Sequence, residues 1–210
     1  MVIENDLAKA IADLDEDRTL ELIKDRLTAG VAALDLLRAC QDGMGEVGRR
    51  FERDEYSVSD LMMSGEIFSL AAELLQPELK TGTAATAGTI VMGTVKGDIH
   101  NLGKDIVVNM LKAANFDVID LGVDVPPEAF VEKLKETGAT VLGMSGLLTL
   151  AFDSMKNTVD CIKAAGLRDR VKIMVGGRPV DANVCRYVGA DNWSTDAQKA
   201  VRIAQDWMVA

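Results

Sequence analysis

The chain contains a single histidine, His100, which lies two residues after Asp98 in a short polar stretch. A carboxylate at this spacing can accept the proton of one ring nitrogen and leave the other nitrogen free to bind a metal. Glycines on both sides, Gly97 and Gly103, leave room for the backbone to approach a large flat group. The alternative interpretation is an ordinary polar turn at the end of a strand, which needs no ligand.

A metal bound by this histidine needs its other coordination positions filled by something other than the protein. A zinc site takes three or four side-chain ligands, and the sequence has no second histidine. The three cysteines, Cys40, Cys161 and Cys185, are far apart and odd in number, which favours neither a thiolate site nor a disulfide framework. A metal inside a macrocycle meets the requirement. The cysteine pattern also predicts a reducing, cytoplasmic environment.

Small residues follow two further strand-like runs. Ser145 to Thr149 follow one run, and Gly176-Gly177 follow another. Alone, Gly-Gly is typical of a tight turn before a helix that Pro179 starts. Together, these ends predict a slot beside the sheet that suits a long appendage inserted edgewise. Nucleotide-binding signatures, a G-x-G-x-x-G or a glycine-rich loop ending in Lys-Ser or Lys-Thr, are absent, and a phospho-receiver would need an aspartate where Ser145 stands.

The second part of the chain alternates short β-branched runs with amphipathic segments. Alternation of this kind predicts βαβ units and a parallel sheet with helices on both faces. We therefore expect an α/β fold with a five-stranded, doubly wound, Rossmann- or flavodoxin-like sheet, and ligands beyond the carboxyl ends of its strands. The predicted strands are 89–95, 116–122, 140–145, 171–176 and 190–194.

The first part of the chain is predicted to be a four-helix bundle. From Ile3 to about Leu79 the apolar residues recur at spacings of three and four. We expect a cap domain at 1–80, a small-residue linker and hinge at 81–88, and the α/β domain at 89–210. The four expected helices are 3–14, one that starts after the acidic cap Asp15-Glu16-Asp17 and ends at Gly30, 31–53, and one capped by Ser57 or Ser59 that stops at Pro77.

Composition and charge narrow the class of partner. The chain of 210 residues is 48% hydrophobic and has a net charge of -10, from 33 acidic against 23 basic residues. The apolar content excludes disorder, and the acidity argues against nucleic acid or an anionic membrane as a partner. No apolar run reaches the roughly 18 residues needed to span a bilayer, and no export signal is apparent. We therefore expect a cytoplasmic protein.

Three separated motifs resemble the cobalamin-binding module shared by methionine synthase, some B12 mutases and corrinoid methyl-carrier proteins. The pattern is Asp-x-His-x-x-Gly, then 41 residues, Ser-x-Leu, then 28 residues and Gly-Gly. The segment 43–68 is similar to the four-helix cap that precedes this module in methionine synthase and in the corrinoid carriers of methanol, methylamine and O-demethylase systems. The resemblance covers practically the whole chain. Its motif residues are Asp98, His100, Gly103, Ser145, Leu147, Gly176 and Gly177.

The resemblance implies that the chain binds cobalamin in the base-off/His-on mode. His100 would be the lower axial ligand of cobalt, replacing the dimethylbenzimidazole of the cofactor, and Asp98 would orient it. Phe51 and Val58 match cap positions that pack over the upper corrin face; the alternative is ordinary bundle core, which is also the expectation for Met62 and Met63. The other expected cofactor-binding residues, which include the lining of the slot for the benzimidazole tail, are Gly103, Ser145, Leu147, Thr149, Gly176 and Gly177.

The function implied by the resemblance is that of a corrinoid subunit in a multicomponent methyltransferase system, not of an enzyme acting alone. A donor-specific methyltransferase would deliver a methyl group from an aryl methyl ether, a methylamine or methanol to cobalt. A second methyltransferase would pass it to tetrahydrofolate or a thiol, and a reductive activator is a further possible partner. An O-demethylase or methylamine system feeding tetrahydrofolate is slightly favoured, because such systems are frequent in the family.

Two alternatives share the cobalamin motif. A cobalamin sensor would need a signalling or DNA-binding domain, for which few residues remain, and the small subunit of a B12 mutase would not need the cap at 43–68. One position departs from the pattern. Methionine synthase extends its His-Asp pair with a serine, and the matching residue here is Ala151. The resemblance therefore does not extend to that part of the proton route.

Overall fold

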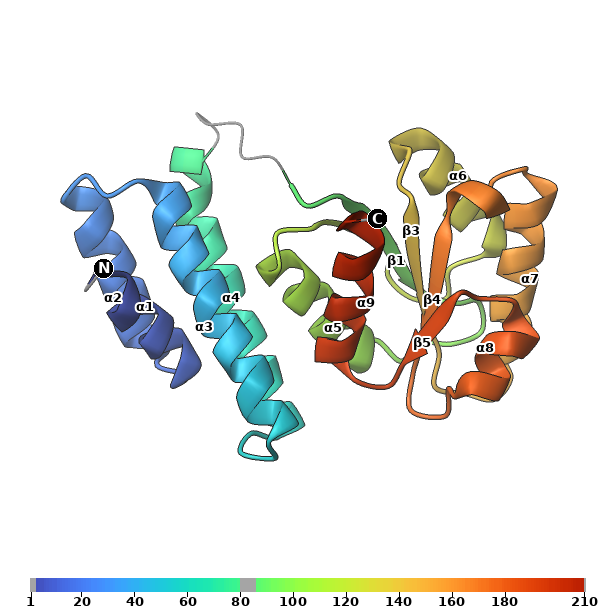
Figure 1. Ribbon diagram of the computed structural model, residues 1–210, viewed down its shortest axis with the longest axis horizontal. Coiled ribbons are helices and arrows are strands. Elements are labelled where there is room, and N and C mark those ends of the chain that lie inside the picture. The colour runs from blue at the N-terminus through green and yellow to red at the C-terminus, as the bar shows by residue number, and fades with distance from the viewer. Residues whose placement is uncertain (1–2, 80–85, 210) are drawn as a thin grey trace. The chain divides into compact units, whose positions relative to one another are not determined.

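The computed structural model describes residues 3–79 and 86–209 and divides the chain into two compact units, Met1–Ala85 and Thr86–Ala210 (Figure 1). Most of the predicted linker, 81–88, falls outside the described residues. The exact domain boundaries therefore stay a prediction.

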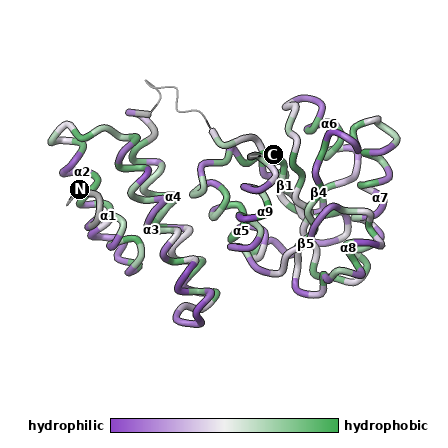
Figure 2. The backbone as a smooth tube through the Cα atoms, viewed as in Figure 1, coloured by the Kyte–Doolittle hydropathy of each residue, from purple (hydrophilic) through white to green (hydrophobic). Residues whose placement is uncertain are grey.

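The N-terminal unit consists of four helices, as the sequence predicts. They are α1 (Ile3–Ala12), α2 (Glu16–Thr28), α3 (Ala33–Glu52) and α4 (Val58–Leu79). Helix α3 packs against α1 and α4, and α2 packs against the same two helices. Hydrophobic and hydrophilic residues alternate along these helices (Figure 2), as expected when one side of each is buried. The bundle core includes Leu7, Ile11, Ile23, Leu36, Met44, Val47, Ile67 and Leu75.

The ends of these helices correct the sequence-based bounds by a few residues. Helix α1 ends at Ala12, because Leu14 adopts a left-handed backbone conformation (φ 61°) that no helix continues. Asp15 caps α2 by accepting the backbone N–H of Arg18 at 3.0 Å, as predicted. Helix α4 runs past Pro77 to Leu79, because a proline in the last turn removes only one backbone donor.

The C-terminal unit contains a five-stranded, all-parallel sheet in the order β2-β1-β3-β4-β5. This order confirms the doubly wound fold and places the switch point between β1 and β3. Each strand is slightly shorter than the apolar run that predicts it. The strands are β1 (Thr89–Thr94), β2 (Asp117–Asp120), β3 (Val141–Ser145), β4 (Lys172–Gly176) and β5 (Asn192–Ser194).

Helices cover both faces of this sheet. On one face, α5 (Leu102–Ala113) packs against α9 (Ala197–Val209). The other face is covered by α6 (Pro127–Thr137), α7 (Ala151–Ala164) and α8 (Ala182–Val188), as Figure 1 shows. The larger core lies under these three helices and includes Val91, Phe130, Leu142, Met144, Met155 and Val175.

The carboxyl ends of β1, β3, β4 and β5 are in register along one edge. Thr94 pairs with Ser145, Ser145 with Gly176, and Gly176 with Ser194. The loops that follow these residues therefore start side by side. This edge brings together the loops that contain the predicted histidine, Ser-x-Leu and Gly-Gly motifs.

Candidate functional site

The histidine loop joins the end of β1 to the start of α5. Within it, Nδ1 of His100 lies 2.7 Å from Oδ1 of Asp98. Because an ionised carboxylate can only accept, Nδ1 carries the proton and Nε2 keeps its lone pair. The imidazole is 48% exposed, whereas the Asp98 side chain is fully buried. The loop therefore offers one accessible nitrogen ligand, Nε2 of His100, and the buried Asp98 fixes the tautomer of the imidazole.

Asp98 uses both carboxylate oxygens. Oδ1 also accepts the backbone N–H of His100 at 2.9 Å, and Oδ2 accepts the N–H groups of Leu147 at 2.7 Å and Leu148 at 3.0 Å. Burial on its own raises the pKa of the Asp98 carboxyl. The hydrogen bonds from Leu148, His100 and Leu147 outweigh burial and lower this pKa to about 2. Asp98 is therefore an anion at neutral pH and connects the histidine loop to the loop after β3.

The Gly-Gly turn after β4 packs against this second loop backbone to backbone. Gly177 has φ 134°, and a Cβ there would lie 2.0 Å from the carbonyl oxygen of Gly146. Gly146 in turn donates its N–H to the Gly176 carbonyl at 3.1 Å. A Cβ on Gly176 would lie 3.0 Å from the carbonyl oxygen of Ser194. The fold itself therefore requires glycine at 177, and a role of this residue in cofactor binding stays a prediction.

Gly103 differs from the Gly-Gly pair. It lies in the first turn of α5, is exposed, and a Cβ there would meet no atom of the chain within 4 Å. Its backbone is not in the left-handed region, so neither packing nor conformation requires a glycine at this position. The open space above it is what the approach of a large external group would need.

Six exposed apolar side chains lie in the histidine loop, at the start of α5 and in the loops after β2 and β3. We call them the apolar rim, and sequence reasoning identified only one of its members, Leu147. Ile99 is 72% exposed and Leu150 is 77% exposed, which is costly for side chains of this size unless something covers them. The signal in the sequence was the apolar run 147–150, which directly follows a polar strand end. The rim consists of Ile99, Leu102, Val123, Leu147, Leu148 and Leu150.

Two other predicted site residues lie along the same edge. Ser145 is the last residue of β3 and is partly buried, and Thr149 is exposed in the following loop. Ala151 begins α7 and is 1% exposed. No hydroxyl of residue 151 is available to Asp98, and the amides of Leu147 and Leu148 satisfy its Oδ2 instead.

Phe51 and Val58 belong to the helical unit, Phe51 in the last turn of α3 and Val58 at the start of α4. Phe51 is partly buried, whereas Val58 is 44% exposed. The bundle-core interpretation of Val58 is therefore wrong. The expectation that Met62 and Met63 are packing residues is also wrong, since both are exposed. Together with Val58 they give the start of α4 an uncovered apolar surface.

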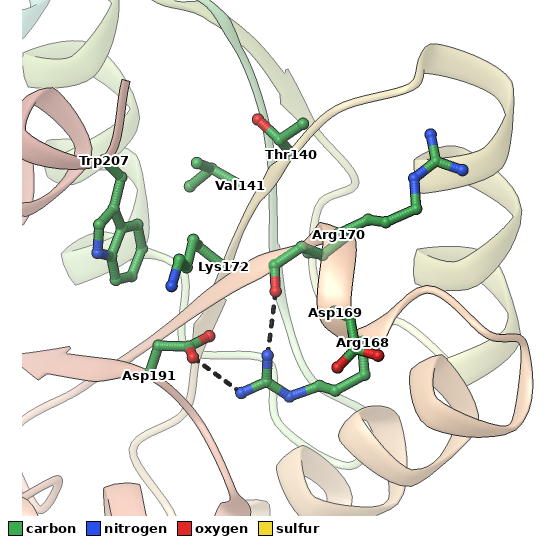
Figure 3. A pocket seen from close by; sticks show the side chains of 9 residues that line it. Thr140, Val141, Arg168, Asp169, Arg170, Lys172, Asp191 and Trp207 are labelled. Carbon is green, nitrogen blue, oxygen red and sulfur yellow. Dashed lines mark hydrogen bonds and ion pairs between the residues drawn. The ribbon is translucent and has the colours of Figure 1, made fainter. Parts of the chain in front are cut away.

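A cavity of about 430 Å³ lies elsewhere in the α/β unit, beside the amino ends of β3 and β4 (Figure 3). Its most buried cation, Arg168, donates to the carbonyls of Val171 and Gly189 and to Asp191, each at 3.0–3.1 Å. Asp191 also accepts the N–H of Ile173 at 2.7 Å. These charges are engaged in holding strand ends together, and none of the predicted site residues lines the cavity.

Residues 3–79 and 86–209 contain no site that could bind a metal ion through protein side chains alone. In these ranges no group of three or more His, Cys, Asp or Glu could bind one. A metal that reaches His100 has to bring its other ligands with it. The same residues form no helix that is long and apolar enough to cross a membrane.

Comparison with protein families identifies the class to which the chain belongs. Residues 88–202 match a family described as B12 binding domain, and residues 3–76 match a second family with the same description. The chain belongs to the corrinoid proteins. Cobalamin, with its cobalt, is the cofactor of this class, as the sequence motifs predict.

Relatives of this corrinoid protein match over nearly their whole length. Trimethylamine corrinoid protein 1 of Methanosarcina acetivorans is 38% identical over 195 residues, which cover 91% of this chain and 90% of the relative. A cobalamin-binding protein of Desulfitobacterium hafniense DCB-2 has a crystal structure that is 43% identical, with a TM-score of 0.80 and 99% of both chains covered. The methanol:cobalamin methyltransferase complex of Methanosarcina barkeri matches with a TM-score of 0.87 at 27% identity, covering 99% of this chain and 80% of that one.

The residues at the carboxyl edge fit a corrinoid. A corrin ring is broad and largely apolar, and the apolar rim offers exposed side chains at the same edge. Gly103 leaves an empty position that a Cβ would fill. His100 provides the single nitrogen donor that a metal with an occupied equatorial plane can accept.

Proposed function

We propose that this corrinoid protein carries a methyl group on the cobalt of cobalamin bound at the carboxyl edge of its sheet, with His100 as the axial ligand in place of benzimidazole. The observation that supports the proposal is the half-exposed imidazole, whose Nδ1 is held by the buried Asp98. When bound, cobalamin supplies a cobalt centre that can accept a methyl group from a donor and release it to an acceptor.

The chain contributes ligand, orientation and exclusion of water. Nε2 of His100 would bind the cobalt, while Asp98 holds Nδ1 and fixes the tautomer. The apolar rim would contact the corrin. Ser145, Leu147 and Gly176 would border the benzimidazole tail, together with Gly103 and Thr149. Gly177 lets the two loops that border this region approach each other.

The donor is proposed to be a methylamine. The relatives include proteins named trimethylamine corrinoid protein and dimethylamine corrinoid protein, at 34–38% identity over most of their length. The match to the methanol:cobalamin methyltransferase complex supports a separate donor methyltransferase as a partner. The proposed acceptor side is a second methyltransferase that uses tetrahydrofolate or a thiol, and a reductive activator is the third proposed partner.

The helical unit is proposed to cap the upper face of the corrin. Its exposed Val58, Met62 and Met63, with the partly buried Phe51, form an apolar surface of the kind that such a role needs. The three cysteines are free thiols, in line with the proposed location in the cytoplasm.

The sensor and mutase alternatives lack support of this kind. Both would share the cobalamin fold, but the matches extend through the helical region at residues 3–76, and the relatives are named after methylamines.

The test is methyl transfer by the reconstituted protein. Loaded with cobalamin and reduced, it is mixed in separate reactions with trimethylamine, dimethylamine, monomethylamine, methanol or an aryl methyl ether, each together with the methyltransferase specific for that donor. We expect the cobalt(I) absorption to be lost with a methylamine and to return when an acceptor and its methyltransferase are added, and both changes to be slower in His100→Ala. A spectrum that no donor changes would contradict the carrier function, and a response to methanol or an aryl ether alone would contradict the methylamine assignment.

A further inference from the structure

The loop between β2 and α6 holds the histidine loop from the side. Asp124, in this loop, donates its backbone N–H to the carbonyl of Asp98 at 2.9 Å. Its carboxylate Oδ1 accepts the backbone N–H of Gly97 at 2.8 Å. Asp124 therefore contacts the main chain of the histidine loop twice, at two successive residues.

The backbone conformation of Asp124 shows that these contacts are specific. Its φ is 52°, in the left-handed region that is strained for an ordinary residue. Glycine would be the least strained residue there, but glycine has no oxygen to offer Gly97. Aspartate tolerates the conformation and supplies the acceptor. The ion pair of Asp124 with Lys96 at 3.3 Å is exposed and adds little.

Thr94 also holds the histidine loop, from the end of β1. It is the last residue of β1 and completely buried, and its hydroxyl donates to the carbonyl of His100 at 3.2 Å. Its backbone N–H donates to the Gly122 carbonyl at 2.9 Å, and its own carbonyl accepts the N–H of Val125 at 3.0 Å. Thr94 thus links the histidine loop to the loop that contains Asp124.

These hydrogen bonds hold the loop backbone at three residues, two before the histidine and the histidine itself. Gly97, Asp98 and His100 are each held through a main-chain atom by Asp124 or Thr94, in addition to the carboxylate of Asp98. A side chain that binds a metal has to be held within about 0.5 Å of its working position. A loop on an exposed edge reaches such precision only if its backbone is fixed.

We propose that Thr94 and Asp124 are positioning residues that fix the backbone of the histidine loop, so that His100 meets the cobalt of cobalamin in one preset geometry. The inference rests on the proposed role of His100 as the axial ligand. Neither residue contacts the imidazole, so both act through the loop.

Two matched pairs of variants separate the hydrogen bonds from the packing. Thr94→Val removes the hydroxyl and keeps the shape, whereas Thr94→Ser keeps the hydroxyl. Asp124→Gly keeps the left-handed conformation and removes the acceptor, whereas Asp124→Asn keeps the acceptor. The full chain of each is loaded with cobalamin, and its affinity and the electron paramagnetic resonance spectrum of the cobalt(II) state are measured. In that spectrum an axial nitrogen splits the lines.

We expect Thr94→Val and Asp124→Gly to bind cobalamin about 10-fold more weakly and to show a smaller fraction of nitrogen-split signal. Thr94→Ser and Asp124→Asn should stay within about 2-fold of the wild-type affinity. Thermal unfolding without cofactor identifies any variant that fails to fold. If Thr94→Val does not fold, the Asp124 pair tests the proposal alone, because Asp124 is exposed and its replacement disturbs no core packing.

¹⁵N labelling of histidine distinguishes the two ways of failing, because it separates the nitrogen of His100 from that of the benzimidazole. If labelling leaves the wild-type splitting unchanged, the proposed ligand is wrong and the positioning role falls with it. If labelling changes the wild-type splitting while folded Thr94→Val and Asp124→Gly keep the same split fraction and the same affinity, the ligand stands and only the positioning proposal is overturned.

Discussion

At the scale of single residues, the site depends on how Asp98 divides its hydrogen bonds. One oxygen faces the ring and backbone of His100, and the other faces two amides of the neighbouring loop. The motif predicts the Asp98–His100 contact, because two residues of separation in a turn allow it. The contacts with Leu147 and Leu148 could not be predicted. These residues lie 49 and 50 positions after Asp98 in the sequence, and the contacts depend on how the two loops approach each other.

Asp98→Asn tests this division. In this variant the amide nitrogen is a donor, and it would face backbone N–H groups, which are also donors, on one side of the residue. We therefore expect the free energy of unfolding of the cofactor-free protein to fall by about 2–3 kcal/mol at pH 7. The folded-state pKa of Asp98, about 2, is below the ordinary 3.8. Its stabilisation is therefore complete above about pH 4 and is lost as the pH falls toward 2. Urea unfolding at several pH values should show the difference from wild type shrinking in that window. A difference that is constant down to pH 2 would contradict the role of the charge.

Leu150→Ala tests the apolar rim. Because Leu150 is 77% exposed, its truncation should change the stability of the cofactor-free protein by less than about 0.5 kcal/mol. If a corrin ring covers it, the cobalamin affinity should fall several-fold. Fluorescence or absorption titration measures the affinity, and thermal unfolding provides the control. An unchanged affinity would place the ring away from this side chain.

At the scale of elements, the alternation of short apolar runs and helices predicted the sheet, its parallel strands and the strand ends that meet at one edge. The same reasoning was less accurate at the ends of elements. Pro77 lies inside α4 and Leu14 lies outside α1, because a helix end depends on a few local backbone contacts that periodicity does not report. For Val58 the same reasoning left two interpretations open, a position facing the corrin and ordinary bundle core, because residue type alone does not separate them; its exposure excludes the second.

Gly103→Ala is expected to have opposite effects on stability and binding. Position 103 is helical with open space around it, so alanine should stabilise the cofactor-free protein by about 0.5–1 kcal/mol. If the glycine leaves room for cobalamin, the affinity should fall, and Gly103→Leu should reduce it further. Thermal unfolding and a cobalamin titration measure the two effects. A stabilised Gly103→Leu protein with full affinity would show that the ring does not approach this residue.

Gly43→Ala tests the packing of the helical unit. A Cβ at Gly43 would lie 2.6 Å from the Ala8 carbonyl oxygen and 2.8 Å from Cβ of Ile11, so we expect a loss of about 1–3 kcal/mol. Gly45→Ala is the matched control, because its nearest neighbour, Nη1 of Arg49, is 3.6 Å away. Chemical denaturation of both variants compares them. Equal stabilities would contradict the close approach of α1 and α3.

At the scale of the whole molecule, the sequence motifs and the family matches agree that both units belong to one cobalamin-binding architecture. What could be predicted was the identity of the cofactor, because three motifs resemble a cobalamin-binding module. The residue types alone indicate only a metal inside a macrocycle. The donor could not be predicted from residues of this chain, because a carrier leaves donor recognition to its methyltransferase. A methylamine donor therefore stays a proposal.

The most direct test uses the fact that His100 is the only histidine in the chain. The protein is produced with ¹⁵N-labelled histidine, loaded with unlabelled cobalamin and reduced to cobalt(II) for electron paramagnetic resonance. If His100 is the axial ligand, the threefold nitrogen splitting seen with ordinary histidine becomes twofold on labelling. A splitting that stays threefold would show that the ligand is the benzimidazole of the cofactor, and the absence of any splitting would show that no nitrogen binds; either result contradicts the account.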